Sequence, residues 1–256
     1  MLEKLVAESR RQVSERKNDR EYVKLIRKRQ DEGYRPLQFK RSAEFNTIIA
    51  EIKPSSPSRG HISSADVEKV ALEYAKAGAM ALSVLTEEKH FGGSLASIEK
   101  IRPKVSIPLM RKDFIVDRFQ VDEALAYNAD GVLLMVSVLG AELAGLLDYC
   151  NSKGMWALVE THTGDEIKVA VDCGAKMIGV NNRDLRTLKV DLKTSINLSQ
   201  HVPEGKLFVV ESGIEKPDDI RMLKEKCQRK PDAFLVGTAL MISPEREKLL
   251  SMMVRA

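Results

Sequence analysis

Cysteine is scarce in this sequence, which argues against a fold held together by disulfides. The 256-residue chain contains only Cys150, Cys173 and Cys227, and none of them forms a C-x-x-C pair. Each cysteine falls in a segment that we expect to be a helix or a helix end. We therefore expect reduced, buried thiols in a cytoplasmic protein, with no disulfide and no metal site.

Histidine is scarce as well. His61, His90, His162 and His201 are scattered along the chain, and they form neither a Ser-His-Asp order nor an H-x-x-x-H zinc pattern. Only His162 lies just past an expected strand. If the protein is an enzyme, we expect lysine and glutamate side chains to transfer the protons.

The sequence also lacks long apolar runs and a strong excess of one charge. No stretch reaches the roughly 18 apolar residues that span a bilayer, and the amino terminus is charged from its third residue, unlike a secretory signal. The net charge is only +4. The densest basic region, 10–41, also contains acidic residues, so we interpret it as a solvated helix surface and not as a nucleic-acid-binding stripe. We expect a soluble protein, monomeric or homodimeric, that binds neither membranes nor nucleic acids.

What the chain does contain is a regular alternation of two patterns. Residues 1–45 have apolar residues at helical spacing among charges, and we expect them to form a helical extension. From residue 46 to residue 256, short apolar runs alternate with amphipathic stretches. The apolar runs, which we expect to be strands, are 47–53, 81–86, 108–114, 131–138, 156–160, 177–182, 207–212 and 233–237. The expected helices are 65–77, 94–101, 118–128, 141–152, 165–172, 193–200, 217–226 and 244–254.

Eight strand–helix units in succession are typical of a single α/β domain. Near-continuous apolar strands favour a parallel sheet covered by helices, and eight such units close into a (β/α)8 TIM barrel. The alternative is an open doubly wound sheet, which would need a G-x-G-x-x-G turn after its first strand. The sequence there is Lys-Pro-Ser-Ser-Pro-Ser-Arg-Gly. We therefore predict a barrel domain over 46–256 with an N-terminal helical extension over 1–45.

Polar side chains end the expected strands. In a barrel the carboxyl ends of all strands meet on one face, where the active sites of this fold lie. Strand alternation points Glu51 and Lys53 to the same side. A single Glu or Lys at a strand end is most often a solvated loop residue, but several strands carrying such groups at one level indicate a functional pocket. The candidates are Glu51, Lys53, Lys112, Glu160, Asn181, Glu211 and Ser212.

Two glycine turns after the last two expected strands predict a phosphate site. In many barrels these loops bind phosphate through backbone N–H groups, and glycine allows the anion to approach closely. The turns are Gly213, which follows Ser212, and Gly237, which precedes Thr238. Ser56, after the first strand, and Arg183 could add donors.

The motifs at these strand ends resemble indole-3-glycerol phosphate synthase of tryptophan biosynthesis. They cover the chain from about residue 45 to its end, in order on successive strands. The quoted motifs are Ile49-Ala-Glu51-Ile-Lys53 with Ser56-Pro57-Ser58, Ser83-Val-Leu-Thr86-Glu87 with Phe91-Gly-Gly-Ser94, Arg111-Lys112-Asp113-Phe114-Ile115, Leu158-Val-Glu160, Gly179-Val-Asn181-Asn182-Arg183-Asp184-Leu185 and Glu211-Ser212-Gly213-Ile214.

The resemblance implies a lyase that closes the ring of an anthranilate–deoxyribulose phosphate with loss of carbon dioxide and water, without a cofactor. Lys112 would be the main general acid and Glu160 its acid/base partner. The other implied catalytic residues are Glu51, Lys53, Asn181, Glu211 and Ser212. The implied phosphate and substrate contacts are Lys53, Ser56, Arg183, Ser212, Gly213, Gly237 and Thr238. The implied wall around the aromatic ring is Leu85, Phe91, Phe114 and Leu133.

Two positions depart from the family pattern, and three alternatives stay open. Pro54 replaces a frequent basic residue, and Gly92, in place of a polar residue, is expected to loosen the loop after the second strand. A Schiff-base aldolase would use Lys112. A glycosidase would use Glu51 and Glu160, although only 5% of the residues are aromatic. The third alternative is a non-catalytic barrel that binds a phosphate ligand.

Overall fold

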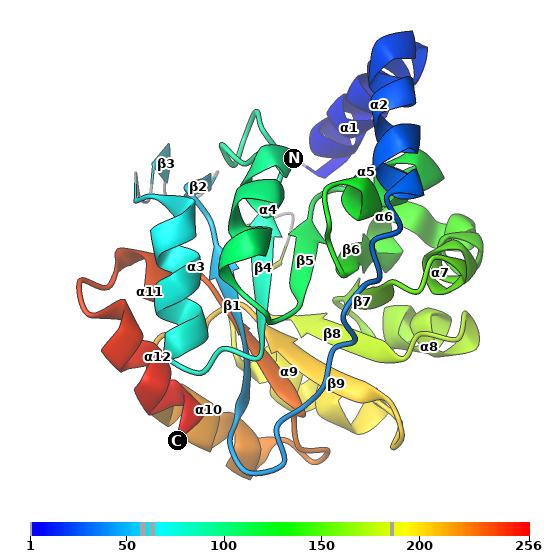
Figure 1. Ribbon diagram of the computed structural model, residues 1–256. Helices are drawn as coiled ribbons and strands as arrows, with labels where there is room; N and C mark the ends of the chain where they lie inside the picture. Colours follow the sequence, from blue (N-terminus) through cyan, green and yellow to red (C-terminus); the bar gives the residue numbers. More distant parts are fainter. Residues whose placement is uncertain (1, 57–59, 62–64, 185–186) are drawn as a thin grey trace.

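Eight parallel strands form a closed barrel in the computed structural model of the chain (Figure 1), which describes residues 2–56, 60–61, 65–184 and 187–256. The order of the strands around the barrel is β1-β10-β9-β8-β7-β6-β5-β4. The strands are β1 (Thr47–Ile52), β4 (Ala81–Leu85), β5 (Leu109–Lys112), β6 (Gly131–Met135), β7 (Trp156–Thr161), β8 (Met177–Asn181), β9 (Leu207–Glu211) and β10 (Ala233–Val236). The predicted (β/α)8 barrel is confirmed.

Each of the eight expected helices is present outside the barrel, with ends close to those predicted. They are α3 (Val67–Lys76), α4 (Leu95–Ile101), α5 (Arg118–Ala126), α7 (Leu143–Ser152), α8 (Gly164–Asp172), α9 (Lys193–Leu198), α10 (Pro217–Lys226) and α12 (Arg246–Val254). Side chains cap several of them at the first turn, because the first N–H groups of a helix have no partner within it. The side-chain oxygens of Asp66, Ser94, Asp117 and Thr163 accept such N–H groups.

Short elements at the carboxyl ends of the strands differ from the prediction. The apolar run 131–138 was predicted as one strand, but β6 ends at Met135 and Val136–Leu139 forms the helix α6. A continuous apolar run does not distinguish a buried strand from a buried helical turn, which explains the error. A second short helix, α11 (Thr238–Ile242), follows β10, and β2 (Ser55–Ser56) pairs with β3 (Gly60–His61) after β1.

Strand alternation divides the core into two layers. One side of each strand packs against the helices, and the other fills the interior of the barrel. The interior cluster is Ile49, Ala81, Met110, Leu133, Met135, Leu158, Met177, Val209, Ala233 and Leu235. Phe39 and Trp156 also pack against this cluster, with ring centroids 5.4 Å apart. A β-carbon on Gly131 would collide with the Trp156 indole, so glycine makes room for this ring.

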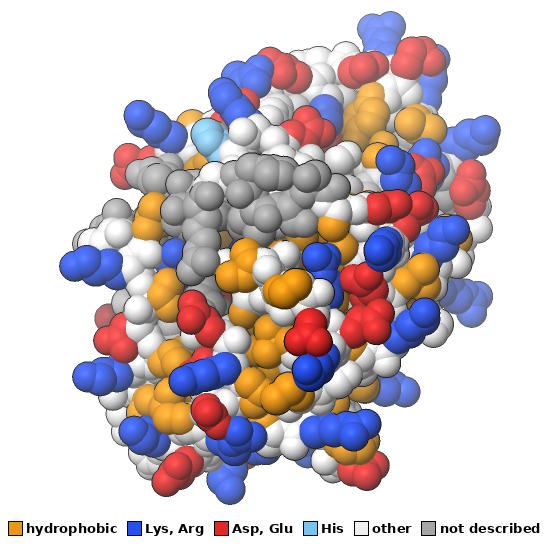
Figure 2. Space-filling model, turned by 90° about the vertical axis from the view of Figure 1, so that its left-hand side faces the viewer, with side chains coloured by type: hydrophobic (Ala, Val, Ile, Leu, Met, Phe, Trp, Pro, Cys, Tyr) orange, Lys and Arg blue, Asp and Glu red, His pale blue; other side chains and the backbone are white. Residues whose placement is uncertain are grey.

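The first two helices pack beside α5. They are α1 (Leu2–Asn18) and α2 (Arg20–Asp31), and the chain then runs along the barrel to β1 (Figure 1). Part of the basic region 10–41 is therefore not solvated surface, contrary to the expectation. Arg16 forms a 2.6 Å ion pair with the buried Glu123, and Arg29 lies 2.9 Å from Glu99. On the face formed by α3, α11 and α12, Figure 2 shows side chains of both charges interspersed.

The three cysteines are free thiols. Cys150 and Cys227 are buried, but Cys173 is only partly buried, so the expectation of burial is wrong for that residue. Within the described ranges, no helix is long and apolar enough to cross a membrane.

Candidate active site

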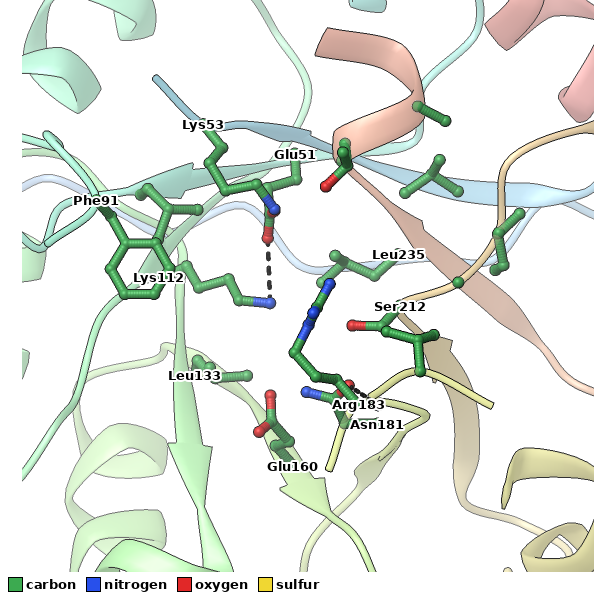
Figure 3. A pocket seen from close by; sticks show the side chains of 18 of the residues that line it. Glu51, Lys53, Phe91, Lys112, Leu133, Glu160, Asn181, Arg183, Ser212 and Leu235 are labelled. Atoms are coloured by element: carbon green, nitrogen blue, oxygen red, sulfur yellow. Dashed lines mark hydrogen bonds and ion pairs between the residues drawn. The ribbon is translucent and has the colours of Figure 1, made fainter. Parts of the chain in front are cut away.

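A pocket opens at the carboxyl ends of the strands (Figure 3), with a volume of about 350 Å³, large enough for a small organic ligand. It brings together most of the residues predicted from the sequence. Those that line it are Glu51, Lys53, Leu85, Phe91, Lys112, Phe114, Leu133, Glu160, Asn181, Arg183, Ser212, Gly213, Gly237 and Thr238. Two predicted residues are placed differently. Glu211 is fully buried at the end of β9, and the side chain of Ser56 lies outside the described part of the chain, as do residues 57–59.

Two lysines and a buried carboxylate form the centre of the pocket. Glu51, at the end of β1, is 3% exposed. Its Oε1 accepts a 2.6 Å hydrogen bond from Lys53 Nζ, and its Oε2 lies 3.1 Å from Lys112 Nζ. Lys112 comes from β5 and also lies 3.4 Å from Glu211 Oε2. The ammonium group of Lys112 is therefore held between two carboxyl groups and points into the cavity (Figure 3).

This arrangement fixes the charges of Lys112 and Glu51. Burial alone would raise the pKa of Glu51, but the nearby ammonium groups of Lys112 and Lys53 outweigh it and lower the pKa to about 2. Burial alone would lower the pKa of Lys112, but Glu51, Glu211 and Glu160 outweigh it and raise the pKa. At neutral pH the Lys112 side chain is therefore protonated and can donate a proton inside the pocket.

The pKa of Glu211 is shifted in the opposite direction to that of Glu51. Burial and the neighbouring carboxylate of Glu160 raise the pKa of Glu211 to about 8. The carboxyl group fits against β8 only because residue 179 is glycine, since a β-carbon there would collide with Glu211 Oε1. A β-carbon on Gly237 would likewise collide with Glu51 Oε1. These two glycines therefore provide space for carboxyl groups, a role that the sequence did not reveal.

Glu160, at the end of β7, is 2% exposed and points into the cavity (Figure 3). The sequence did not indicate that His162 lies beside the Glu160 carboxylate. His162 Nε2 lies 3.4 Å from Glu160 Oε1. The only signal in the sequence was the position of His162 just past the strand, two residues beyond Glu160.

The turn after β9 has the geometry expected of an anion site. Ser212 and Gly213 have positive φ angles of 66° and 85°. The amide of Asn182 donates a 3.0 Å hydrogen bond to the carbonyl of Ser212, which holds the turn against β8. The Arg183 guanidinium and the Ser212 hydroxyl both point into the cavity, on the side away from Phe91 (Figure 3). Asn181 Oδ1 accepts the backbone N–H of Arg183 at 2.9 Å and so fixes the start of the loop.

The opposite wall is apolar, and hydrogen bonds hold the loop that carries Phe91. The rings of Phe91 and Phe114 lie 6.3 Å apart, and Leu85 and Leu133 complete this wall. Glu87, a pocket residue that the sequence did not suggest, accepts the backbone N–H groups of His90 and Phe91 at 2.7 and 2.9 Å.

The expectation that Gly92 loosens this loop is not supported by its hydrogen bonds. Gly92 donates to the carbonyl of Glu88 at 3.1 Å, and Gly93 donates to the carbonyl of Glu87 at 2.8 Å. Gly92 has a φ of 62°, which glycine adopts at little cost. The glycine therefore permits a tight turn.

The barrel and its pocket of paired lysines and glutamates define a (β/α)8-barrel enzyme. The family model "Indole-3-glycerol phosphate synthase" matches residues 2–253, and the chain belongs to this family. An indole-3-glycerol phosphate synthase from Aquifex aeolicus is 49% identical over 199 residues, covering 77% of this chain and 76% of that protein. One from Koribacter versatilis is 40% identical over 245 residues, covering 94% and 93%.

Solved structures with low sequence identity share the fold. A 3-hexulose-6-phosphate synthase matches with a TM-score of 0.65 at 15% identity, covering 82% of this chain and 100% of that one. A thiamine phosphate pyrophosphorylase from Pyrococcus furiosus matches with a TM-score of 0.61 at 16% identity, covering 81% and 93%. These similarities concern the barrel alone.

Proposed function

We propose that this chain converts 1-(2-carboxyphenylamino)-1-deoxyribulose 5-phosphate to indole-3-glycerol phosphate, with release of carbon dioxide and water. Membership of the synthase family supports this reaction. The observation that carries it is the Lys112 ammonium, held 3.1 Å from Glu51 and 3.4 Å from Glu211 inside the pocket. The reaction needs a proton donor of this kind where a carbonyl oxygen gains negative charge.

Lys112 acts first in this proposal. An aromatic carbon of the substrate attacks the ketone carbon, and negative charge develops on the ketone oxygen. A lysine ammonium at that oxygen supplies both a proton and charge stabilisation. Loss of the ring carboxylate as carbon dioxide then restores aromaticity. Glu51 supports the step because its charge keeps Lys112 protonated before the attack.

Dehydration needs a second acid and a base. One group must protonate the departing hydroxyl, and another must remove the last ring proton. Glu160 points into the cavity and is placed to act as the base. Lys53 and Glu51 assist proton transfer, and the Lys53 ammonium holds the substrate carboxylate, while Asn181 orients the substrate hydroxyls. Glu211 and Ser212 complete the catalytic group.

The substrate phosphate binds on the side of the pocket formed by the segments that follow β8, β9, β10 and the neighbouring β1. The donors proposed there are Lys53, Ser56, Arg183, Ser212, Gly213, Gly237 and Thr238. Positive φ angles at Ser212 and Gly213 favour this assignment, since turns of this kind present backbone N–H groups to anions. The aromatic ring then lies against Leu85, Phe91, Phe114 and Leu133, opposite the phosphate.

The raised pKa of Lys112 disfavours a Schiff-base aldolase. Imine formation requires a neutral amine, and enzymes that use one lower the pKa of the lysine. Here the surrounding carboxyl groups outweigh burial and raise it. The charged state suits a proton donor, and the proposed reaction requires no cofactor.

The domain organisation, location and oligomeric state of the enzyme also belong to this proposal. Residues 1–45 form an extension that packs on a catalytic barrel of residues 46–256, an assignment supported by the contacts of α2 with α5. The protein works in the cytoplasm as a monomer or homodimer, on a small sugar phosphate.

One experiment tests the function directly. The purified chain is incubated with 1-(2-carboxyphenylamino)-1-deoxyribulose 5-phosphate, and the indole product is followed by fluorescence. Release of carbon dioxide is measured in parallel. Equal yields of indole and carbon dioxide support the proposal, whereas a folded protein that yields neither contradicts it.

A further inference from the structure

His162 lies between two carboxylates, only one of which lines the pocket. Its Nε2 is 3.4 Å from Glu160 Oε1, and its Nδ1 is 3.4 Å from Glu166 Oε2 on α8. Both ring nitrogens are buried and have no well-aligned hydrogen bond within the described structure. A buried imidazole with an acidic group at each nitrogen is most stable when both nitrogens carry a proton.

Glu166 is fixed in this position by the start of α8. Thr163 Oγ1 accepts the backbone N–H of Glu166 at 3.2 Å, and the Glu166 carboxylate accepts the backbone N–H of His162 at 2.6 Å. These two hydrogen bonds hold the Glu166 carboxylate beside His162 and set the side of the imidazole that faces it. The other ring nitrogen is thereby directed toward Glu160.

Glu160 also has an acidic neighbour. The carboxylate of Glu160 helps to raise the pKa of Glu211, because two adjacent buried carboxyl groups do not both ionise easily. Lys112 lies 3.4 Å from Glu211 and also acts on Glu160, so a group that faces mainly Glu160 can decide which of the two carboxyl groups keeps the negative charge. His162 lies within ion-pair distance of Glu160, whereas its effect on Glu211 is a weaker charge interaction.

We propose that His162, oriented by Glu166, is a positioning residue that keeps the Glu160 carboxylate ionised, so that Glu160 is the base and Glu211 the protonated member of the pair. The inference rests on the proposed function, since it concerns the base of that reaction. His162 does not line the pocket, so it acts through Glu160 without contacting the substrate.

The charged neighbours of His162 are consistent with an imidazolium. Glu160 comes from β7, Glu166 from α8 and Glu211 from β9. The helix α6, which packs on α8 and β7, has no charged residue. His201, in the short 3-10 helix Ser199–His201, lies against Gly164. Burial would lower the pKa of His162, but Glu166, Glu160 and Glu211 outweigh it and raise the pKa.

The test compares pH profiles of His162→Gln with those of the wild type. Glutamine keeps a polar group near Glu160 but cannot carry a positive charge, so the negative charge of Glu160 loses its neighbouring counter-charge. The acidic limb of the kcat profile should then move to higher pH by about one unit, which lowers kcat about tenfold at pH values on that limb and leaves it almost unchanged on the plateau above it. KM should change little, because the phosphate and ring contacts are intact.

Two further variants are compared with His162→Gln and with the wild type. Glu166→Gln should move the acidic limb in the same direction by a smaller amount, because it weakens the protonation of His162. His201→Gln removes an exposed imidazole and should follow the wild-type profile. If His162→Gln does not fold, nitrogen NMR of the histidine-labelled wild type gives the answer, with both His162 ring nitrogens expected to be protonated near neutral pH.

The outcomes separate this inference from the proposed function. A wild type that forms no indole product contradicts the proposed function itself. An active wild type with an acidic limb unchanged in His162→Gln overturns the role of His162 alone. A fall in kcat by the same factor at every pH also overturns it, because a purely structural defect would have that effect. A neutral His162 in the NMR experiment is equally incompatible with it.

Discussion

Gly179 on β8 leaves the space that the carboxyl group of Glu211 on β9 occupies. The two residues lie on neighbouring strands, and a β-carbon at residue 179 would collide with Glu211 Oε1. The missing side chain on one strand is therefore the condition for a buried acid on the next. Because Glu211 also lies 3.4 Å from Lys112, the same glycine indirectly positions the proposed general acid.

Gly179→Ala should displace Glu211 and lower both stability and kcat. Overpacking of this kind typically costs about 1–3 kcal/mol in the free energy of unfolding, measured by urea denaturation. The control is Gly145→Ala on α7, where an added β-carbon meets only Arg118 at 3.4 Å and should be tolerated. When Gly179→Ala is combined with Glu211→Ala, it should lower the free energy of unfolding much less than it does in the wild type. Equal costs in both backgrounds would contradict a direct collision.

Glu211 should make the protein less stable as the pH rises. Its pKa is about 8 in the folded chain against an ordinary value of 4.5, so between these values the folded state binds a proton that the unfolded state has lost. The free energy of unfolding therefore falls with rising pH in this window, by at most about 1.4 kcal/mol per pH unit from this one group. Glu211→Gln should remove that fall.

Urea denaturation at a series of pH values measures this difference. The gap between Glu211→Gln and the wild type should widen from about pH 5 to about pH 8 and then remain constant. Glu225→Gln, on the exposed part of α10, controls for the loss of a surface carboxylate. A gap that is independent of pH would mean that Glu211 is ionised throughout.

The barrel was predictable from the sequence because the alternation of short apolar runs with amphipathic stretches, and the polar residues at the strand ends, are local properties. Glu51 and Lys53 stand two residues apart on one strand, so their common direction follows from the pleat alone. The pairing of Glu51 with Lys112 depends on the order of the strands, since only β4 separates β1 from β5. The expected strand beyond Met135 failed because an apolar run carries no information on where the backbone turns helical.

The remaining features of the site depend on which side chain fills which space. Nothing local to Gly179 indicates that a carboxyl group from β9 lies beside it. His162 fits no triad or metal pattern in the sequence, and its contact is with Glu160, only two residues away. The burial of Glu211 could not be predicted either, since a Glu at the end of a strand is usually solvated.

Lys112→Ala should abolish turnover and leave substrate binding nearly intact. The ammonium donates a proton in the proposed reaction, and a general acid is typically worth about 10²- to 10⁴-fold in rate. The affinity for a non-reactive substrate analogue, measured by titration calorimetry, should stay within about an order of magnitude, because the phosphate and ring contacts come from other residues. Lys69→Ala, on the exposed side of α3, is the matched control and should retain full activity. Loss of binding as large as the loss of rate would make Lys112 mainly a binding residue.

Asp130→Asn should detach the segment that joins the N-terminal helices to β1. The fully buried carboxylate accepts hydrogen bonds from Tyr34 Oη and the Leu37 N–H, both at 2.6 Å, and from the Leu109 N–H at 2.7 Å. It also forms a 2.8 Å ion pair with Arg102. Loss of the charge leaves Arg102 without its counter-ion, which should lower the free energy of unfolding by about 3–5 kcal/mol. Tyr34→Phe removes one hydrogen bond and should cost only about 1 kcal/mol in the same urea titration. Similar losses in the two variants would mean that Asp130 acts as a neutral acceptor and that its charge does not hold the segment in place.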